Sequence, residues 1–253
     1  MSPSEQKDYF STQAREYKKF RPDYPATLYD FLQADLAENP IILDCATGNG
    51  QAAMGFAHEN SRVLGIDLSF EQLSNASRKS NCLWLQSTVE ALPIATAAID
   101  LVCVAQALHW FNFEKFYPEV KRVLKPEGRI AVWTYSLLAA CVQFEAPIEN
   151  VVRWFYHDVV GDYWPPERRW VDDEYRSIPF PFEEIRTPSF AIEMSWDKSD
   201  LLGYISSWSA VQLYANQMGD NPMPLLEERL NSVWPEENYQ IRFSWPLSVR
   251  VGR

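Results

Sequence analysis

Short apolar runs alternate with amphipathic segments along the first half of the chain. Each run ends at small or polar residues, as expected of a buried strand bounded by loops. The runs occupy residues 41–43, 63–66, 81–86, 99–104 and 130–134. The first amphipathic segment, residues 25–37, has the apolar spacing of a helix. Because strands alternate with helices, we expect a doubly wound α/β fold with residues 25–135 as its core.

The regular alternation ends after residue 134. Residues 136–188 are rich in proline and aromatic side chains, and they predict an α-helical, aromatic lid inserted after the fifth strand. Beyond it we expect a sixth strand, helices and a terminal antiparallel strand, at residues 189–196, 197–234 and 239–251. The pattern therefore predicts one domain, residues 1–253, with a mostly parallel seven-stranded sheet and a C-terminal part over residues 189–253.

The loop after the first apolar run carries the most informative motif. Residues 44–50 read Asp-Cys-Ala-Thr-Gly-Asn-Gly, and Asp67 ends the next run. Small residues let the backbone approach a ligand, and an acidic residue ending the second strand is placed to hold a ribose diol. The glycines fit the dinucleotide fingerprint, so a nicotinamide cofactor is one candidate. The carboxylate of Asp44 favours the cationic, phosphate-free S-adenosylmethionine, because it would repel a pyrophosphate.

The pattern D-x-A-x-G-x-G at residues 44–50 resembles the first motif of class I S-adenosylmethionine-dependent methyltransferases, which usually have glycine at Ala46. Residues 87–93 are similar to the adenine-binding segment of that family. Residues 105–111 resemble the A-x-H-W signature of a small-molecule subgroup that includes trans-aconitate methyltransferase-like proteins. Residues 17–25 resemble the start of that subgroup, Y-x-x-x-RP-x-YP. The resemblance spans about residues 9–135, and it implies a Rossmann-like methyltransferase type 11 domain.

The resemblance also implies where the cofactor is bound. Asp67 would hold the ribose, the segment at Thr88 would receive the adenine, and Tyr17 and Arg21 would fold over the methionine end. The expected cofactor contacts are Tyr17, Arg21, Asp44, Ala46, Gly48, Gly50, Asp67, Leu68, Thr88, Val89 and Gln106.

Gln106 and His109 are the candidate catalytic residues, because they follow the fourth strand, where the donor methyl group should emerge. A histidine there could deprotonate a hydroxyl or phenol, since its ordinary pKa is near neutrality. Alternatively, His109 and Trp110 brace the fourth strand against the lid. We favour bracing, because a carboxylate acceptor is already an anion and needs no base. Gln106 either lines the transfer pocket or is a solvated loop residue.

Composition limits the partners. The formal net charge is −11 and no basic stripe is present, which disfavours a nucleic-acid acceptor. The four cysteines form no C-x-x-C pair, so we expect free thiols and a cytoplasmic location. The three histidines lack metal-ligand spacing, and we expect no metal site. No apolar run is long enough to span a bilayer, so we expect no membrane partner.

We therefore expect an enzyme that transfers a methyl group from S-adenosylmethionine to a small organic molecule, with an oxygen acceptor such as a carboxylate. Arginine suits bidentate recognition of a carboxylate better than lysine does. Between Gly128 and Lys198 the chain has no lysine, but it has Arg129, Arg153, Arg168, Arg169, Arg176 and Arg186. The alternatives are an NAD(P)-dependent reductase and a non-catalytic S-adenosylmethionine-binding protein. We expect a monomer or homodimer.

Overall fold

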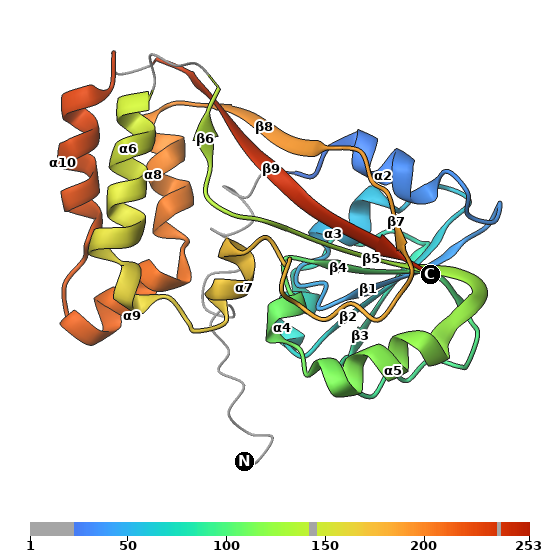
Figure 1. Cartoon of the computed structure of the whole chain (residues 1–253). Helices are drawn as coiled ribbons and strands as arrows, with labels where there is room; N and C mark the ends of the chain where they lie inside the picture. The colour runs from blue at the N-terminus through green and yellow to red at the C-terminus, as the bar shows by residue number, and fades with distance from the viewer. Residues whose placement is uncertain (1–22, 142–145, 237–238) are drawn as a thin grey trace.

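The computed structural model describes residues 23–141, 146–236 and 239–253 (Figure 1). In these ranges the main feature is a nine-stranded sheet, ordered β3-β2-β1-β4-β5-β9-β6, with β7 and β8 also paired to β9. The strands that run parallel are β1 (Ile41–Cys45), β2 (Arg62–Asp67), β3 (Cys82–Gln86), β4 (Ile99–Ala105) and β5 (Leu124–Tyr135). The order reverses between β1 and β4, so the carboxyl ends of these two strands flank a crevice where ligands bind in such sheets.

Strand β9 (Ile241–Gly252) joins the parallel sheet to an antiparallel extension. Its residues 247–252 pair with β5, and its residues 241–247 pair with β8 (Phe190–Trp196). Two further partners of β9 are only two residues long, β6 (Ala139–Ala140) and β7 (Glu184–Ile185). The sheet therefore has nine strands instead of the seven expected, because strands this short leave no periodicity in the sequence.

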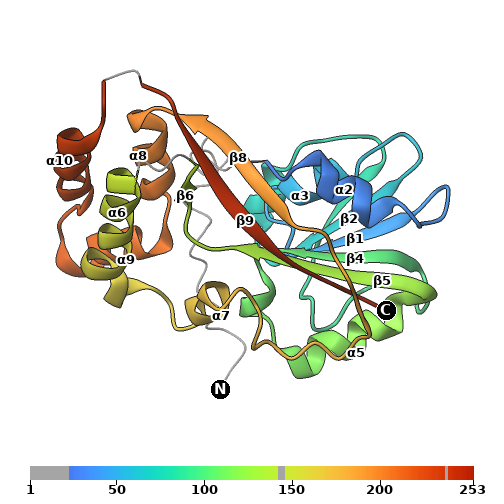
Figure 2. The same cartoon turned by 45° about the horizontal axis from the view of Figure 1, so that its top comes forward.

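Helices cover both faces of the parallel strands, as expected of a doubly wound fold. Helices α2 (Ala26–Gln33) and α3 (Gln51–Gly55) lie on one face, and α5 (Phe113–Val123) lies on the other (Figures 1 and 2). Short helix α4 (Phe70–Ser74) follows β2. Side chains alternate between the faces along each strand. Ile42 and Trp133 pack in the core with α2 and α3, whereas Leu43 and Val132 pack in the core with α5.

The remaining helices gather beside the sheet, near the end of β8 and the start of β9 (Figure 2). They are α6 (Ala146–Trp154), α8 (Lys198–Ser206), α9 (Ser209–Met218) and α10 (Met223–Val233). Helix α10 contacts α6 and α8, so segments from before and after β8 form one helical layer. In the described ranges, no helix combines the length and the apolar character that crossing a membrane requires.

Four short helical segments connect these layers. Segment η2 (Leu108–Trp110) follows β4, and α7 (Arg168–Asp172) packs against it. The π-helical turn η4 (Phe155–Val159) continues α6, and η5 (Gly161–Tyr163) leads toward α7. Aromatic rings join the layers, since Tyr156 of η4 contacts both Trp164 and Trp208.

Candidate active site

The loop between β1 and α3 turns sharply at the carboxyl ends of the strands. Ala46, Gly48 and Gly50 have φ angles of 53°, 56° and 83°, which lie in the left-handed region. The turn brings the backbone N–H of Gly48 to Oδ2 of Asp67, at 2.8 Å. Alanine in this conformation costs roughly 1–2 kcal/mol that glycine avoids. Ala46 therefore keeps the loop geometry at an energetic cost.

Trp84 of β3 packs beneath this loop, a contact that sequence reasoning missed. A Cβ atom added to Gly50 would lie 2.6 Å from the Trp84 ring, and one added to Gly65 of β2 would lie 2.4 Å from it. Both positions must therefore lack a side chain for the indole to fit. Gly50 lies against this ring rather than among the residues that line the cavity described below.

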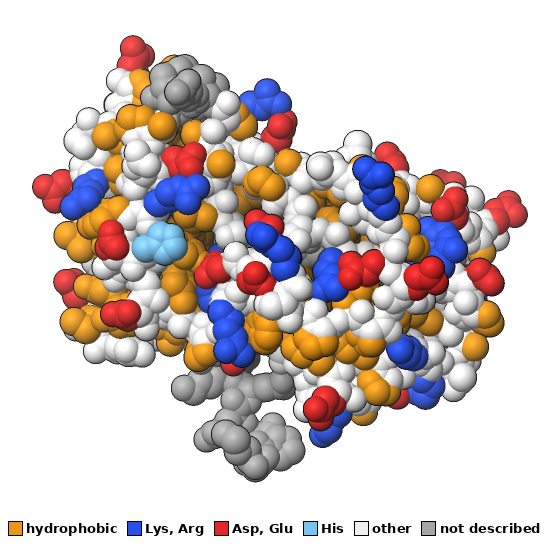
Figure 3. Space-filling view, in the orientation of Figure 1, with side chains coloured by type: hydrophobic (Ala, Val, Ile, Leu, Met, Phe, Trp, Pro, Cys, Tyr) orange, Lys and Arg blue, Asp and Glu red, His pale blue; other side chains and the backbone are white. Residues whose placement is uncertain are grey.

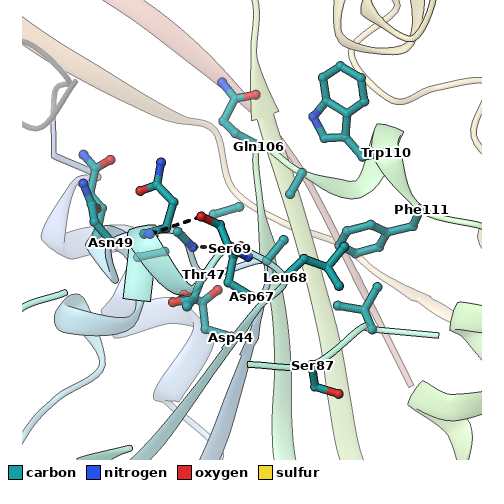
Figure 4. Close-up of a pocket in the computed structure, with 18 of the residues that line it drawn as sticks. Asp44, Thr47, Asn49, Asp67, Leu68, Ser69, Ser87, Gln106, Trp110 and Phe111 are labelled. Carbon is teal, nitrogen blue, oxygen red and sulfur yellow. Dashed lines mark hydrogen bonds between the residues drawn. The ribbon is translucent and has the colours of Figure 1, made fainter. Parts of the chain in front are cut away.

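Asp67 is held in place by two backbone groups. Its Oδ2 accepts from Gly48 N, and its Oδ1 accepts from Ser69 N at 2.8 Å. Figure 4 shows the carboxylate between the β1 loop and the start of α4. The aspartate therefore shapes the loop and the approach to α4, and it also faces the cavity.

Asp44 is a buried carboxyl group at the end of β1, only 1% exposed. Its Oδ2 accepts from the Thr47 hydroxyl at 2.5 Å, and its Oδ1 has no hydrogen-bond partner in the described part of the chain. Burial raises the pKa of Asp44 to about 7, although the Thr47 hydrogen bond opposes the shift. A buried acceptor atom without a partner is costly. The site therefore fits a ligand that brings a cationic donor, as the ammonium group of S-adenosylmethionine does.

These groups border one cavity of about 550 Å³, which is within the usual range for small-molecule sites. Figure 4 shows its side chains arriving from the β1 loop, the end of β2, the segment after β3 and the segment after β4. The expected residues that line it are Asp44, Ala46, Gly48, Asp67, Leu68, Val89 and Gln106. Tyr17 and Arg21 lie outside the described residues. Sequence reasoning missed other lining residues, including Ser87, Glu90, Trp110, Phe111 and Glu167.

Thr88 does not line this cavity. Its hydroxyl donates to Oε2 of Glu90, and the Glu90 carboxylate also accepts from Asn112 N at 3.2 Å. Glu90 therefore brings an acidic group to the cavity from a position two residues after Thr88. In the sequence, the acidic Glu90 two positions after Thr88 was the signal that could have identified this lining residue.

Gln106 separates this cavity from a second one of about 80 Å³. Its φ is 55°, its Nε2 donates to Tyr135 O at 3.0 Å, and its Oε1 accepts from the Thr134 hydroxyl at 2.6 Å. Both ends of the amide are thus attached to the end of β5. Gln106 therefore lines both cavities and is not a solvated loop residue.

His109 lines the second cavity but not the first. Its Nδ1 lies 2.8 Å from the Tyr175 hydroxyl. Burial lowers the pKa of His109 to about 3, and the nearby Arg168 charge lowers it further. The imidazole is therefore neutral at physiological pH and is a poor proton acceptor. Within the described ranges, no three His, Cys, Asp or Glu side chains are grouped so that they could hold a metal ion.

The parallel strands are ordered β3-β2-β1-β4-β5, and a left-handed loop and two aspartates border a cavity at their carboxyl ends. This arrangement defines a Rossmann-like nucleoside-binding protein. Residues 43–132 match the profile of the methyltransferase domain family. A Dictyostelium discoideum protein classed as a methyltransferase is 32% identical over 231 residues, covering 90% of this chain and 87% of that protein.

A solved structure described as a type II methyltransferase, from Anaeromyxobacter dehalogenans, is 34% identical with a TM-score of 0.83, covering 92% of this chain and 98% of that one. A Saccharomyces cerevisiae protein classed as an S-adenosylmethionine-dependent methyltransferase is 26% identical over 132 residues, or 49% of this chain and 45% of that protein. The chain belongs to the class I S-adenosylmethionine-dependent methyltransferase family. This membership decides against the nicotinamide-dependent reductase.

Proposed function

We propose that the larger cavity binds S-adenosylmethionine and that the second cavity receives a small organic molecule, which is methylated on an oxygen such as that of a carboxylate. The observation that carries this proposal is that the two cavities share Gln106, Trp110 and Tyr135. A donor in one cavity and an acceptor in the other would meet at these three side chains. The resemblance of residues 105–111 to the trans-aconitate methyltransferase-like subgroup is consistent with a small acceptor.

Each end of the cofactor has a chemically suitable partner. We assign the ribose to Asp67 and the ammonium group to Asp44, whose Oδ1 is buried and unpartnered in the described ranges. Leu68, Val89 and Phe111 offer apolar surface to the adenine ring, and Glu90 replaces Thr88 as the candidate acceptor for its amino group. Tyr17 and Arg21 remain proposed contacts of the methionine end.

The bound cofactor supplies an electrophilic methyl group on a sulfonium. The chain supplies position and exclusion of water. Gln106 is fixed by β5 between the two cavities, and Trp110 and Tyr135 cover the passage between them. An anionic oxygen needs no base, so alignment along the transfer direction provides most of the rate enhancement. A neutral His109 that is bonded to Tyr175 is consistent with this mechanism.

The acceptor side is built by the segment that we propose as a lid. Residues 136–188 contribute Trp164 and Arg168, but α8 and the start of α9 contribute Tyr204 and Trp208. The proposed lid therefore includes part of the C-terminal region 189–253, within one domain. On the face drawn in Figure 3, basic and acidic side chains are interspersed, which supports a small acceptor rather than nucleic acid. We further propose a cytoplasmic location, since Cys45, Cys82, Cys103 and Cys141 are free thiols. We also propose that the protein is a monomer or a homodimer.

The test is a methylation assay with S-adenosylmethionine over matched carboxylic acids, phenols and amines. Mass spectrometry of the product identifies the methylated atom, and formation of S-adenosylhomocysteine measures turnover. We expect a methyl ester from at least one small carboxylic acid. Exclusive methylation of amines, or turnover with none of the panel, would overturn the oxygen-acceptor proposal.

A further inference from the structure

The second cavity has aromatic walls and one strongly basic side chain. Among the described residues, Arg168 is the only Lys, Arg, Asp or Glu side chain that lines it. Its neighbours there include Trp110, Trp164 and Trp208, and His109 contributes a neutral imidazole. The cavity therefore presents a positive charge among apolar surfaces, where a charge interaction is stronger than in water.

Arg168 is held rigidly from behind. Its Nε donates to the Tyr156 hydroxyl at 2.7 Å, and that hydroxyl donates to Oδ1 of Asp172 at 2.6 Å. The guanidinium carbon lies 4.5 Å from the centroid of the Trp164 ring, a stacking distance. Tyr156 thus relays between the arginine and a carboxylate, so that Arg168 has a fixed direction before any ligand arrives.

The outer end of this guanidinium is available to a ligand. Only Nε has hydrogen-bond partners in the described part of the chain, at Tyr156 and, more weakly, at Asp172 Oδ1, 3.3 Å away. Nη1 and Nη2 have none there. A pre-positioned guanidinium with two free nitrogens can donate both to one carboxylate oxygen, and it loses little rotamer entropy on binding.

We propose that Arg168 is the residue that selects the acceptor, by binding the carboxylate of a small monocarboxylic acid whose short apolar body packs between the aromatic walls. This inference rests on the proposed function. A single water molecule needs a cavity volume of roughly 10–15 Å³. The cavity, of about 80 Å³, can thus hold a carboxylate and a few carbon atoms.

The same contact explains how the product leaves. One carboxylate oxygen bonded to Arg168 leaves the other oxygen to face the passage at Gln106. Formation of the oxygen–carbon bond breaks the carbon–sulfur bond, whose electron pair stays on sulfur, and no proton is transferred. The anionic acid becomes a neutral ester, so its ion pair with Arg168 is lost. The ester should bind more weakly than the acid.

The test compares Arg168→Met and Arg168→Lys with a matched control, Arg169→Met. Arg169 is the next residue along the chain, is exposed, stacks on Trp170 at 4.7 Å and lines neither cavity. Short monocarboxylates such as butyrate, crotonate and benzoate serve as probes, each beside its uncharged amide. Calorimetry with S-adenosylhomocysteine present measures binding, and steady-state kinetics measure KM and kcat for any acid that is methylated.

We expect wild type to bind an acid but not its amide. Arg168→Met should raise the Kd and KM for the acid about 10- to 100-fold, as expected for a lost charge-assisted hydrogen bond. Arg168→Lys should recover part of that loss, and Arg169→Met should match wild type. The affinity for S-adenosylhomocysteine should stay within about threefold in all variants, which separates acceptor binding from misfolding.

Methylation of an acid with the same KM in wild type and Arg168→Met would overturn this inference and leave the proposed function intact. If Arg168→Met does not fold, equal binding of acid and amide by wild type would overturn the inference without any variant. A wild-type enzyme that methylates only amines would instead overturn the proposed function, together with the inference that depends on it.

Discussion

His109 Nδ1 and the Tyr175 hydroxyl lie 2.8 Å apart, and this hydrogen bond joins the end of β4 to the segment that follows α7. Tyr175 is only 1% exposed, so water does not compete for the bond. The arrangement is the one expected if the histidine braces the fourth strand against the proposed lid. It also favours a carboxylate acceptor, which needs no base.

His109→Gln should therefore have a small effect on catalysis. Removing a general base typically lowers the rate by ~10²–10⁴-fold, whereas a packing role predicts a loss below about tenfold. The wild-type rate should also stay level between pH 5.5 and 7.5, because a group with a pKa of about 3 does not titrate there. Initial rates of the variant and wild type across this range test the prediction. A large loss with unchanged folding and cofactor affinity would make His109 the base.

The same pKa predicts how stability depends on pH. Unfolded His109 binds a proton near its ordinary pKa of 6.5, but the folded protein resists protonation until about pH 3. The folded state therefore loses stability as pH falls from 6.5, by at most about 1.4 kcal/mol per unit. Asp44 acts in the opposite direction, because its raised pKa favours folding at low pH. In urea unfolding, His109→Gln should lose less stability than wild type between pH 6.5 and 5; equal losses would contradict the shift.

Cofactor binding should release a proton from Asp44. The pKa of this carboxyl group is raised to about 7, so it is partly protonated at pH 6.5. A cationic ammonium beside Oδ1 favours the ionised form, and affinity should therefore increase from pH 6 to 7 and level off above it. Calorimetry at pH 6.5 in buffers with different ionisation enthalpies measures the released protons. Asp44→Asn should abolish the release, and an unchanged proton count in that variant would assign it elsewhere.

Asp67→Ala should weaken S-adenosylhomocysteine binding by roughly 2–3 kcal/mol, because charge-assisted hydrogen bonds to the ribose would be lost. Calorimetry measures the affinity, and the matched control is Glu71→Ala, an exposed acidic residue of α4 that does not line the cavity. The variant also removes the acceptor for Gly48 N and Ser69 N. Thermal unfolding of the ligand-free protein must therefore accompany the titration. Unchanged affinity would leave Asp67 with the loop-shaping role alone.

Ala46→Gly should stabilise the protein by up to about 1 kcal/mol. Glycine relieves the cost of a left-handed φ, but part of the gain is offset by the greater freedom of the unfolded chain. Ala97 is a matched control, since its φ is 52° and it lies outside the cavity. Both glycine variants should increase the free energy of unfolding in urea, and only Ala46→Gly has reason to change cofactor affinity. Destabilisation by Ala46→Gly alone would mean that its methyl group packs favourably.

Much of the larger cavity could be predicted because its lining depends on local sequence. Apolar runs mark the strands, and parallel neighbours end at the same edge of the sheet. Asp44 and Asp67, 23 positions apart, therefore meet at one cavity. Thr88 was expected to line the cavity, but Glu90 lines it instead, because the Thr88 hydroxyl is used to hold Glu90. No spacing rule reports that internal hydrogen bond.

The smaller cavity, which we propose as the acceptor site, could not be predicted in the same way. Arg168 was one of six arginines with equal claim, and its sequence neighbours do not distinguish it. Tertiary packing distinguishes Arg168 from the other arginines. Its guanidinium stacks on Tyr156 and Trp164, which come from different segments, and Trp208 from a third segment packs against both rings. Similarly, the need for glycine at position 65 depends on Trp84 of the neighbouring strand.

Two consecutive residues at the start of α7 line different cavities, Glu167 the larger one and Arg168 the smaller one. A shift of this one-turn helix would move both side chains together. If either ligand changes the position of α7, thermodynamic linkage requires that the two ligands alter each other's affinity by the same factor. Donor binding and acceptor binding would then be coupled through this short helix.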